Sequence, residues 1–384
     1  MDAIGDELRS SVADMPHQTD RFASVYKVLG NAIASRAFPG CAFGVLAGGE
    51  VVLADALGSF TYEENSFFIE PHTVFDVASI TKVVSTTAVA MLLYQRGLLD
   101  LDTPLGELLP GFVVGRSNGR LARQVTIRHL LAHNSGLPGY VEFFRTVSTP
   151  AGLYRACLEL PIETVPGERS EYSDPGFILL GKALEVLTRE DLATWARKQV
   201  FDSLGMTGTG FLPASEQRPL IPPTEIDNEF RHRLIQGEVQ DENAFVLNGI
   251  AGHAGLFSNV SDLLRFAGEI LSGFNSGEPE HGTALFTRDT IESFAKRQGP
   301  EGSSRALGWD TPSKESSAGQ YFSAHSIGHL GYSGCSLWID FDSAVSAVLL
   351  TNRTWPDRQC QLIREVRPSF HDAVRLALSG QQAL

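Results

Sequence analysis

The sequence of 384 residues contains little cysteine and no long apolar run. Its four cysteines, Cys41, Cys157, Cys335 and Cys360, are scattered and form no C-x-x-C pair. This spacing argues against a disulfide framework or a cysteine zinc site, and it predicts buried free thiols in a reducing compartment. No stretch approaches the ~20 apolar residues of a membrane span. The ten histidines show no H-E-x-x-H or comparable spacing, so we expect neither a metal nor another cofactor.

Positive charge is also scarce. Lys and Arg number 31 against 45 Asp and Glu, which gives a formal net charge of −14. That balance argues against a nucleic-acid partner, because such a partner requires a basic face. The first seven residues are acidic and lack the basic and apolar regions of a signal peptide, so we expect a cytoplasmic protein, with a chain trimmed of its leader as the alternative. The sequence leaves the oligomeric state open.

The most informative element that is present is Ser79-Ile80-Thr81-Lys82, which opens an apolar segment that we expect to form one long helix from about Ser79 to Arg96. Residues 77–93 carry only one charge, that of Lys82. Side chains three apart on a helix share a face, so the Lys82 amine can reach the Ser79 hydroxyl. A serine hydroxyl needs such a base to become a nucleophile. We therefore predict that Ser79 is a nucleophile, rather than a simple helix cap, and that burial lowers the pKa of Lys82.

Two further elements accompany it: Tyr172-Ser173-Asp174, before an apolar helical start, and Gly328-His329-Leu330-Gly331-Tyr332, before a strand-like run. In this order the three elements resemble the serine β-lactamase and penicillin-binding-protein superfamily. The resemblance is closest to the class C-like branch, in which S-x-x-K, Y-x-N and K-T-G line one cleft. It covers roughly residues 20–380.

The resemblance implies a role for several residues. Tyr172 would act as the second base and later as the acid for the leaving group. Because a phenol titrates near ~10, that role requires a cation such as Lys82 nearby. The backbone N–H groups of Ser79 and Tyr332 would form an oxyanion hole. Gly331 would allow the substrate to approach the strand edge.

Substrate contacts are expected from Asp174, His329, Asn134 and His253 as well as Gly331, with alternatives for three of them. Asp174 hydrogen-bonds Lys82 or orients substrate, or else it caps the helix that begins near Pro175. His329 donates to substrate or is protonated part of the time, or else it packs in the core. His253 either lines the cleft or stabilises a glycine-rich turn.

Two departures from the family pattern affect substrate choice. The Asn of Y-x-N is Asp174, and K-T-G is His329-Leu330-Gly331. The lost lysine and threonine help to hold a substrate carboxylate in the family, and Arg353 or Arg358 is a candidate substitute cation. We therefore predict a serine hydrolase that forms an acyl-enzyme at Ser79. Its substrates would be small carboxylic esters or amide bonds of cell-wall-type peptides, with weak β-lactamase activity at most.

Other functions fit the same motifs. They are a true class C-like β-lactamase, a D-aminopeptidase, a muramyl-peptide amidase or an acyltransferase. A catalytically silent sensor of cell-wall fragments is a further alternative from a different class. Gly115-Arg116-Ser117-Asn118-Gly119 also fits the G-x-S-x-G elbow of α/β-hydrolases, but it lies in a polar loop without the required strand. We interpret that match as chance.

Strand-like runs occur near both chain ends, at 41–47, 51–56, 336–341 and 344–351, with helical segments between them. This order predicts an α+β protein of the β-lactamase/transpeptidase type. Its antiparallel sheet would be built from both chain ends and flanked by helices, including 20–37 and 360–378. We expect one catalytic domain over 1–384. An α/β part would comprise 20–96 and 309–384, and a mainly helical part 97–308.

Overall fold

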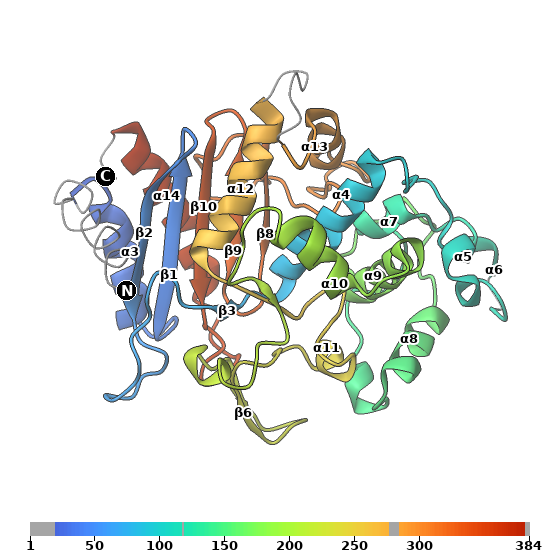
Figure 1. The fold of residues 1–384 in the computed structure, drawn as a ribbon, viewed down its shortest axis with the longest axis horizontal. Helices are drawn as coiled ribbons and strands as arrows, with labels where there is room; N and C mark the ends of the chain where they lie inside the picture. The colour runs from blue at the N-terminus through green and yellow to red at the C-terminus, as the bar shows by residue number, and fades with distance from the viewer. Residues whose placement is uncertain (1–19, 117–118, 276–283, 381–384) are drawn as a thin grey trace, which may run out of the picture.

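The computed structural model describes residues 20–116, 119–275 and 284–380. Ser117, in the rejected elbow motif, lies outside these ranges. Five antiparallel strands form the main sheet in the order β2-β1-β10-β9-β8 (Figure 1). Their bounds are β1 Gly40–Ala47, β2 Glu50–Gly58, β8 Ser326–Leu330, β9 Ser336–Asp340 and β10 Val345–Thr351. Strands from the two chain ends thus share one sheet, which confirms the predicted fold class.

Both faces of this sheet are covered, because side chains alternate between faces along each strand. On one face, helices α3 (Ala23–Ala34) and α14 (Ile363–Ser379) form a core with the strands. On the other face lies α12 (Val260–Asn275), which belongs to the larger core. Along β1, Phe43 and Val45 join the first core, whereas Ala42 and Leu46 join the second. Helix α12 falls within the range expected to be the helical part, yet it packs on the sheet.

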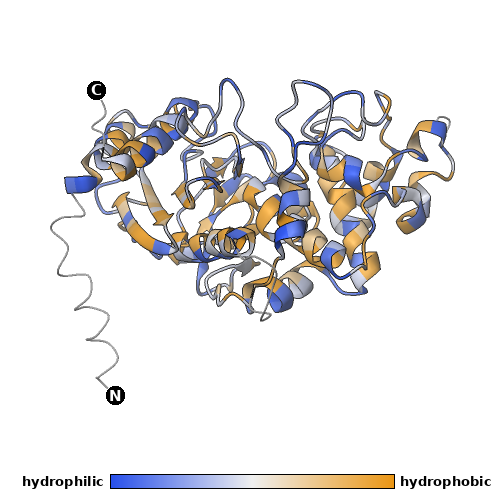
Figure 2. Cartoon of the chain, turned by 90° about the horizontal axis from the view of Figure 1, so that it is seen from above, coloured by the Kyte–Doolittle hydropathy of each residue, from blue (hydrophilic) through white to orange (hydrophobic). Residues whose placement is uncertain are grey.

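The remaining helices lie mostly beside the sheet, on the right of Figure 1. They are α4 Ala88–Gln95, α5 Leu105–Leu108, α6 Gly119–Ala122, α7 Ile127–Leu131, α8 Pro150–Glu159, α9 Asp174–Thr188, α10 Leu192–Ala196, α11 Glu242–Val246 and α13 Arg288–Ala295. The described residues also form two small sheets. One contains β3 (Phe75–Asp76), β7 (Leu256–Ser258) and β4 (Gly210–Phe211), and the other pairs β5 (Glu225–Asp227) with β6 (Arg233–Ile235). Figure 2 shows apolar residues mainly on the strands and neighbouring helices. In the described ranges, every helix is too short or too polar to cross a bilayer.

The sequence predicted one regular helix from Ser79, but the segment that follows β3 does not form one. It begins as a 3-10 turn at Ala78–Ile80, continues as a π-helix at Lys82–Thr87 and becomes α-helical only in α4. β-branched residues dominate the π-helical stretch, and they fit poorly against the preceding turn of an α-helix. Thr86 also donates from Oγ1 to the Gly252 carbonyl at 2.6 Å. Such wide turns recur at functional sites.

Phe43 provides a test of the sheet–helix packing. Its side chain is fully buried in β1, and its ring packs edge-on against Tyr26 and Phe370 at centroid distances of 5.5 and 6.3 Å. Phe43→Ala should reduce the free energy of unfolding by about 3–5 kcal/mol, because it removes buried area and leaves a cavity. Thermal unfolding would measure this. Val51→Ala, at a 54% exposed position of β2, is the control and should change little. Equal effects of the two substitutions would contradict the described packing.

Candidate active site

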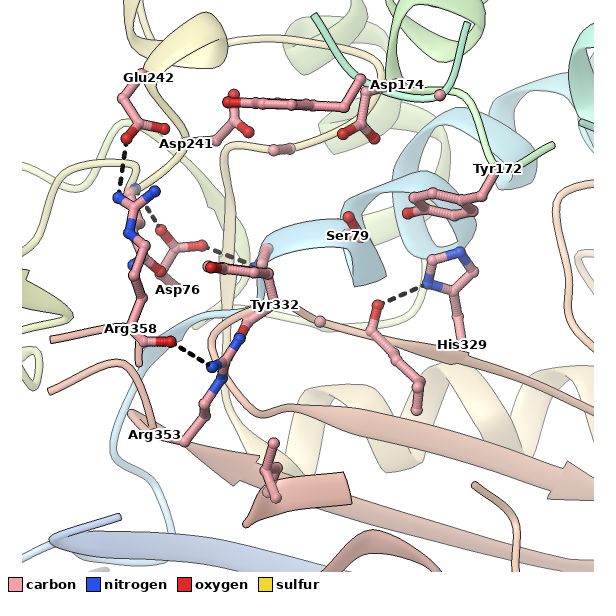
Figure 3. Close-up of a pocket in the computed structure, with 18 of the residues that line it drawn as sticks. Asp76, Ser79, Tyr172, Asp174, Asp241, Glu242, His329, Tyr332, Arg353 and Arg358 are labelled. Atoms are coloured by element: carbon pink, nitrogen blue, oxygen red, sulfur yellow. Dashed lines mark hydrogen bonds and ion pairs between the residues drawn. The ribbon is translucent and has the colours of Figure 1, made fainter. Parts of the chain in front are cut away.

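Residues from all three sequence motifs line one cleft of about 720 Å³, here called the Ser79 cleft. Ser79 lies between Tyr172 and His329 on one side and Tyr332 on the other (Figure 3). Asp174 and Asp241 lie along a further wall. The cleft is thus bounded by the turn after β3, the start of α9 and the end of edge strand β8.

Lys82 lies beneath Ser79 with no exposed surface. Its ammonium donates to Ser79 Oγ at 3.0 Å, to Asp174 Oδ1 at 2.6 Å and to the His253 carbonyl at 3.1 Å. These three acceptors match its three N–H bonds. The prediction that Lys82 reaches Ser79 is confirmed, and the buried charge is both paired and fully hydrogen-bonded, as burial requires.

The expected fall in the Lys82 pKa is wrong. Burial does lower this pKa, but the Asp174 carboxylate and Tyr172 raise it, and the net displacement is upward. The sequence argument considered burial alone and did not include an anion within hydrogen-bond distance. Lys82 is therefore an ammonium in the resting site.

Tyr172 is also held in its protonated form. Its ring centroid lies 4.7 Å from Lys82 Nζ, so the cation expected near the phenol is present. Burial nevertheless raises the Tyr172 pKa more than Lys82 lowers it, and Asp174 raises it further. At neutral pH the pair is an ammonium and a phenol.

The start of α9 decides between the two roles considered for Asp174. Ser173, not Asp174, caps this helix: its Oγ accepts from the Gly176 N–H at 3.1 Å. Asp174 is the first helical residue, and its carboxylate forms the ion pair with Lys82. The capping alternative for Asp174 is therefore wrong, because the neighbouring serine already occupies that role.

His133 supports Tyr172, and the sequence reasoning did not select it. Its backbone is left-handed, with φ of 54°. Its Nδ1 accepts from the Ser173 N–H at 2.9 Å, and its ring stacks between Tyr172 and Phe177 at centroid distances of 4.5 and 4.8 Å. The only signal in the sequence is its place in the turn before Gly136, which does not identify the side chain that faces Tyr172.

His329 does not provide the cation that the family has at this position. Its Nδ1 lies 2.8 Å from the Leu330 carbonyl and must donate to it, so the neutral ring presents Nε2 as an acceptor. Burial, Lys82 and Arg305 hold its pKa well below the ordinary value. Nε2 is buried without a hydrogen-bond partner. The expectation of partial protonation is therefore wrong.

The two arginines considered as substitutes are already engaged. Arg353 donates to the carbonyls of Tyr332, Arg358 and Cys360 at 2.8, 3.1 and 3.0 Å. Arg358 donates to Glu225 and Glu242, each at 2.8 Å. Both guanidinium groups serve to hold the wall of the cleft.

The other predicted residues occupy different positions. A Cβ on Gly331 would lie 2.4 Å from the Val77 carbonyl, so glycine is needed there for packing against the turn that carries Ser79. His253 offers its carbonyl to Lys82, while its Nε2 pairs with Asp241 at 2.9 Å. Asn134 is buried and is not among the residues that line the cleft. All four cysteines are free, and only Cys360 is partly exposed.

Asp76 joins three walls of the cleft, a role that the sequence did not reveal. Its Oδ1 accepts from the Ala78 N–H at 2.8 Å and its Oδ2 from the Gln240 N–H at 2.7 Å. Its backbone carbonyl accepts from Ser333 Oγ at 2.7 Å. Ala78 has a left-handed φ of 47°, a conformation that costs energy for a residue with a Cβ. Asp76 therefore holds the strained residue immediately before Ser79.

With this geometry established, similarity to known proteins becomes informative. The fold is that of the β-lactamase-type serine hydrolases. The sequence model of the Beta-lactamase family matches residues 25–367, and the chain belongs to that family. An N-acetylmuramyl-L-alanine amidase of Bacillus subtilis (strain 168) is 29% identical over 371 residues, which span 87% of this chain and 81% of the amidase.

Two solved structures share the fold. EstCE1, described as a hydrolase with promiscuous acyltransferase activity, has a TM-score of 0.74 at 21% identity, covering 93% of this chain and 99% of its own. An octameric penicillin-binding protein homologue from Pyrococcus abyssi has a TM-score of 0.72 at 23% identity, covering 94% and 78%. At these identities the likeness extends to the fold alone.

The position of Asp76 leads to a pH prediction. Burial raises its pKa to about 6, against the two N–H groups that stabilise the carboxylate. Protonation weakens its acceptor oxygens, so turnover should fall as pH drops below about 6. Asp76→Asn should lower kcat at all pH values and remove the part of the acid limb that lies below about pH 6, since Asn does not titrate. A pH–kcat profile with an ester substrate measures both effects.

The control is Asp102→Asn, at a carboxylate whose side chain is 64% exposed, which should keep the wild-type profile. An acid limb that persists unchanged in Asp76→Asn would assign the titration to another group.

Proposed function

We propose that this protein forms an acyl-enzyme at Ser79 and hydrolyses small carboxylic esters or amide bonds of cell-wall-type peptides. The observation that carries the proposal is the 3.0 Å hydrogen bond between Ser79 Oγ and the fully buried Lys82, inside a cleft that Tyr172 also lines. A lysine that only contributed charge to the surface would remain in contact with water, so the burial of Lys82 beside Ser79 favours a functional role. Membership of the Beta-lactamase family supports the same chemistry.

The reaction starts from the form of the site in which the Lys82–Tyr172 pair has lost one proton. Ser79 Oγ attacks the carbonyl carbon and passes its own proton to this pair. The developing oxyanion is stabilised by the backbone N–H groups of Ser79 and Tyr332. The bond to the leaving group then breaks, and the leaving group takes the proton by way of Tyr172. Water repeats the sequence on the acyl-enzyme and releases the acid.

The proposed substrate class follows from the neutral state of His329 and the apolar Leu330. Together they replace a cation and a hydroxyl that would hold the carboxylate of a β-lactam. Loss of a charge-assisted hydrogen bond removes ~1.5–3 kcal/mol, so β-lactam turnover should be weak. The 29% identical amidase supports muramyl peptides as one substrate group.

The nucleophile assignment is tested with Ser79→Ala. This change should abolish covalent labelling by a fluorophosphonate, seen by intact mass. It should also remove nearly all turnover of short p-nitrophenyl esters and muramyl peptides, because it deletes the attacking oxygen. Nitrocefin should be a poor substrate of the wild type in the same panel.

Ser117→Ala, in the rejected elbow motif, is the matched control and should retain labelling and turnover. Full activity of Ser79→Ala, or loss of labelling in Ser117→Ala, would refute the assignment. Nitrocefin turnover as efficient as that of the best ester would refute the substrate class.

Asp174 should set the pH range of activity. The reactive form of the Lys82–Tyr172 pair is deprotonated, and Asp174 raises the pKa of both residues. The wild-type rate should therefore rise with pH into the alkaline range. Asp174→Asn removes the carboxylate and lowers both pKa values, so the rising limb should move to lower pH. Profiles of kcat/KM against pH measure this shift.

Glu142→Gln is a suitable control, because Glu142 also lines the cleft but pairs with Arg145. Its profile should match the wild type. A limb in Asp174→Asn that stays in place or moves to higher pH would argue against the coupled pair.

A further inference from the structure

We propose that Arg305 binds a carboxylate on the leaving group of the substrate, a role that rests on the proposed function. Neither the motifs nor the resemblance identified this residue. Arg305 lines the Ser79 cleft, and its guanidinium carbon lies 5.1 Å from the centre of the Tyr172 ring. Arg305 belongs to the segment before β8, whereas the family has its lysine on β8 itself.

A short connection holds Arg305 in this position. Arg305 and Asp310 form an antiparallel bridge, and Asp310 forms another with Gly328 of β8. In the second bridge, each residue donates its N–H to the carbonyl of the other at 2.9 Å. The segment thus extends the sheet by one bridge, next to His329. Arg305 is carried to the cleft by backbone hydrogen bonds, independently of any contact made by its own guanidinium.

The guanidinium of Arg305 is the least engaged of the buried or partly buried arginines that line the cleft. Arg353 and Arg358 are held as described above, and Arg367 donates to three carbonyls of the loop after β8. In the described part of the chain, Arg305 makes no hydrogen bond through its guanidinium. Its nearest carboxylate oxygen is Asp310 Oδ2, at 3.9 Å. Asp310 is itself held, since its Oδ1 accepts from Ser304 Oγ at 2.6 Å.

A guanidinium with unused donors matches a carboxylate, which accepts two parallel hydrogen bonds. Its place beside Tyr172 defines which part of the substrate it meets. Tyr172 is proposed to pass a proton to the leaving group, so the group within reach of Arg305 belongs to the leaving group. Asp174 and Asp241 also line the cleft, and despite its burial the pKa of Asp241 is lowered to about 2 by His253 and backbone hydrogen bonds. A substrate carboxylate next to these anions would be repelled, which favours its binding at Arg305.

The test compares two esters that differ only in this charge: 3-acetoxybenzoate, with a carboxylate on the leaving group, and its methyl ester. Arg305→Ala should reduce kcat/KM for 3-acetoxybenzoate by roughly 10- to 100-fold, mainly through KM, on the usual scale of a charge-assisted hydrogen bond. Turnover of the methyl ester should stay within about twofold. Arg305→Lys, which keeps the charge but not the planar fork, should fall between Ala and wild type.

Arg364→Ala is the matched control, because Arg364 also lines the cleft but is exposed at the start of α14. It should leave the ratio between the two esters unchanged. An equal loss for both esters in Arg305→Ala would show that Arg305 acts on Tyr172 rather than on substrate, and would overturn the proposal. So would an equal loss of preference in Arg364→Ala, since it would reflect only the general charge of the cleft.

A binding measurement separates this proposal from the proposed function. Ser79→Ala can hold 3-acetoxybenzoate without consuming it, and calorimetry would give its affinity. Adding Arg305→Ala should weaken that affinity by about tenfold or more. If the wild type hydrolyses neither ester but this difference in affinity is observed, the hydrolase function fails while the carboxylate site stands. An unchanged affinity would refute the carboxylate site whatever the turnover.

Discussion

A lysine without exposed surface must find acceptors for all three of its N–H bonds, and Lys82 finds them on three separate segments. The first is its own turn, through Ser79, the second is the start of α9, through Asp174, and the third is the glycine-rich loop at His253. Removing one partner of a buried ion pair typically costs 3–5 kcal/mol, because the other charge remains buried. The burial of one ammonium therefore fixes the relative positions of the elements that form the cleft.

This arrangement carries a cost for reactivity. A neutral amide at position 174 would accept the same hydrogen bond without holding the lysine in its charged form. The carboxylate instead stabilises an ammonium and a phenol, the two protonation states that are least able to accept a proton from serine. Natural enzymes commonly exchange stability against activity at such sites. Here the exchange occurs at the side chain of Asp174. Asp76 provides a second restraint, because it holds the strained turn at Ala78.

Much of the fold and part of the site could be predicted from the sequence. Strand-like runs near both chain ends predict one antiparallel sheet covered by helices, and the spacing of Ser79 and Lys82 predicts their contact. The protonation states could not be predicted, since they depend on Asp174, which is 92 positions away from Lys82. His133 and Arg305 were missed for a similar reason. Each lies against the ring of Tyr172, and only the tertiary structure shows which side chains face that ring.

The sheet that joins the two chain ends also imposes an order on biosynthesis. In the register of β1 and β10, Cys41 pairs with Thr351, 310 positions later. At ~5–20 residues per second, β1 and β2 leave the ribosome about 15–60 s before their central partner. During that interval the free edge of β1 and its apolar side chains have no native cover, and such edges pair readily with other chains. The nascent protein thus depends on protection of its first hairpin until nearly the whole polypeptide has been made.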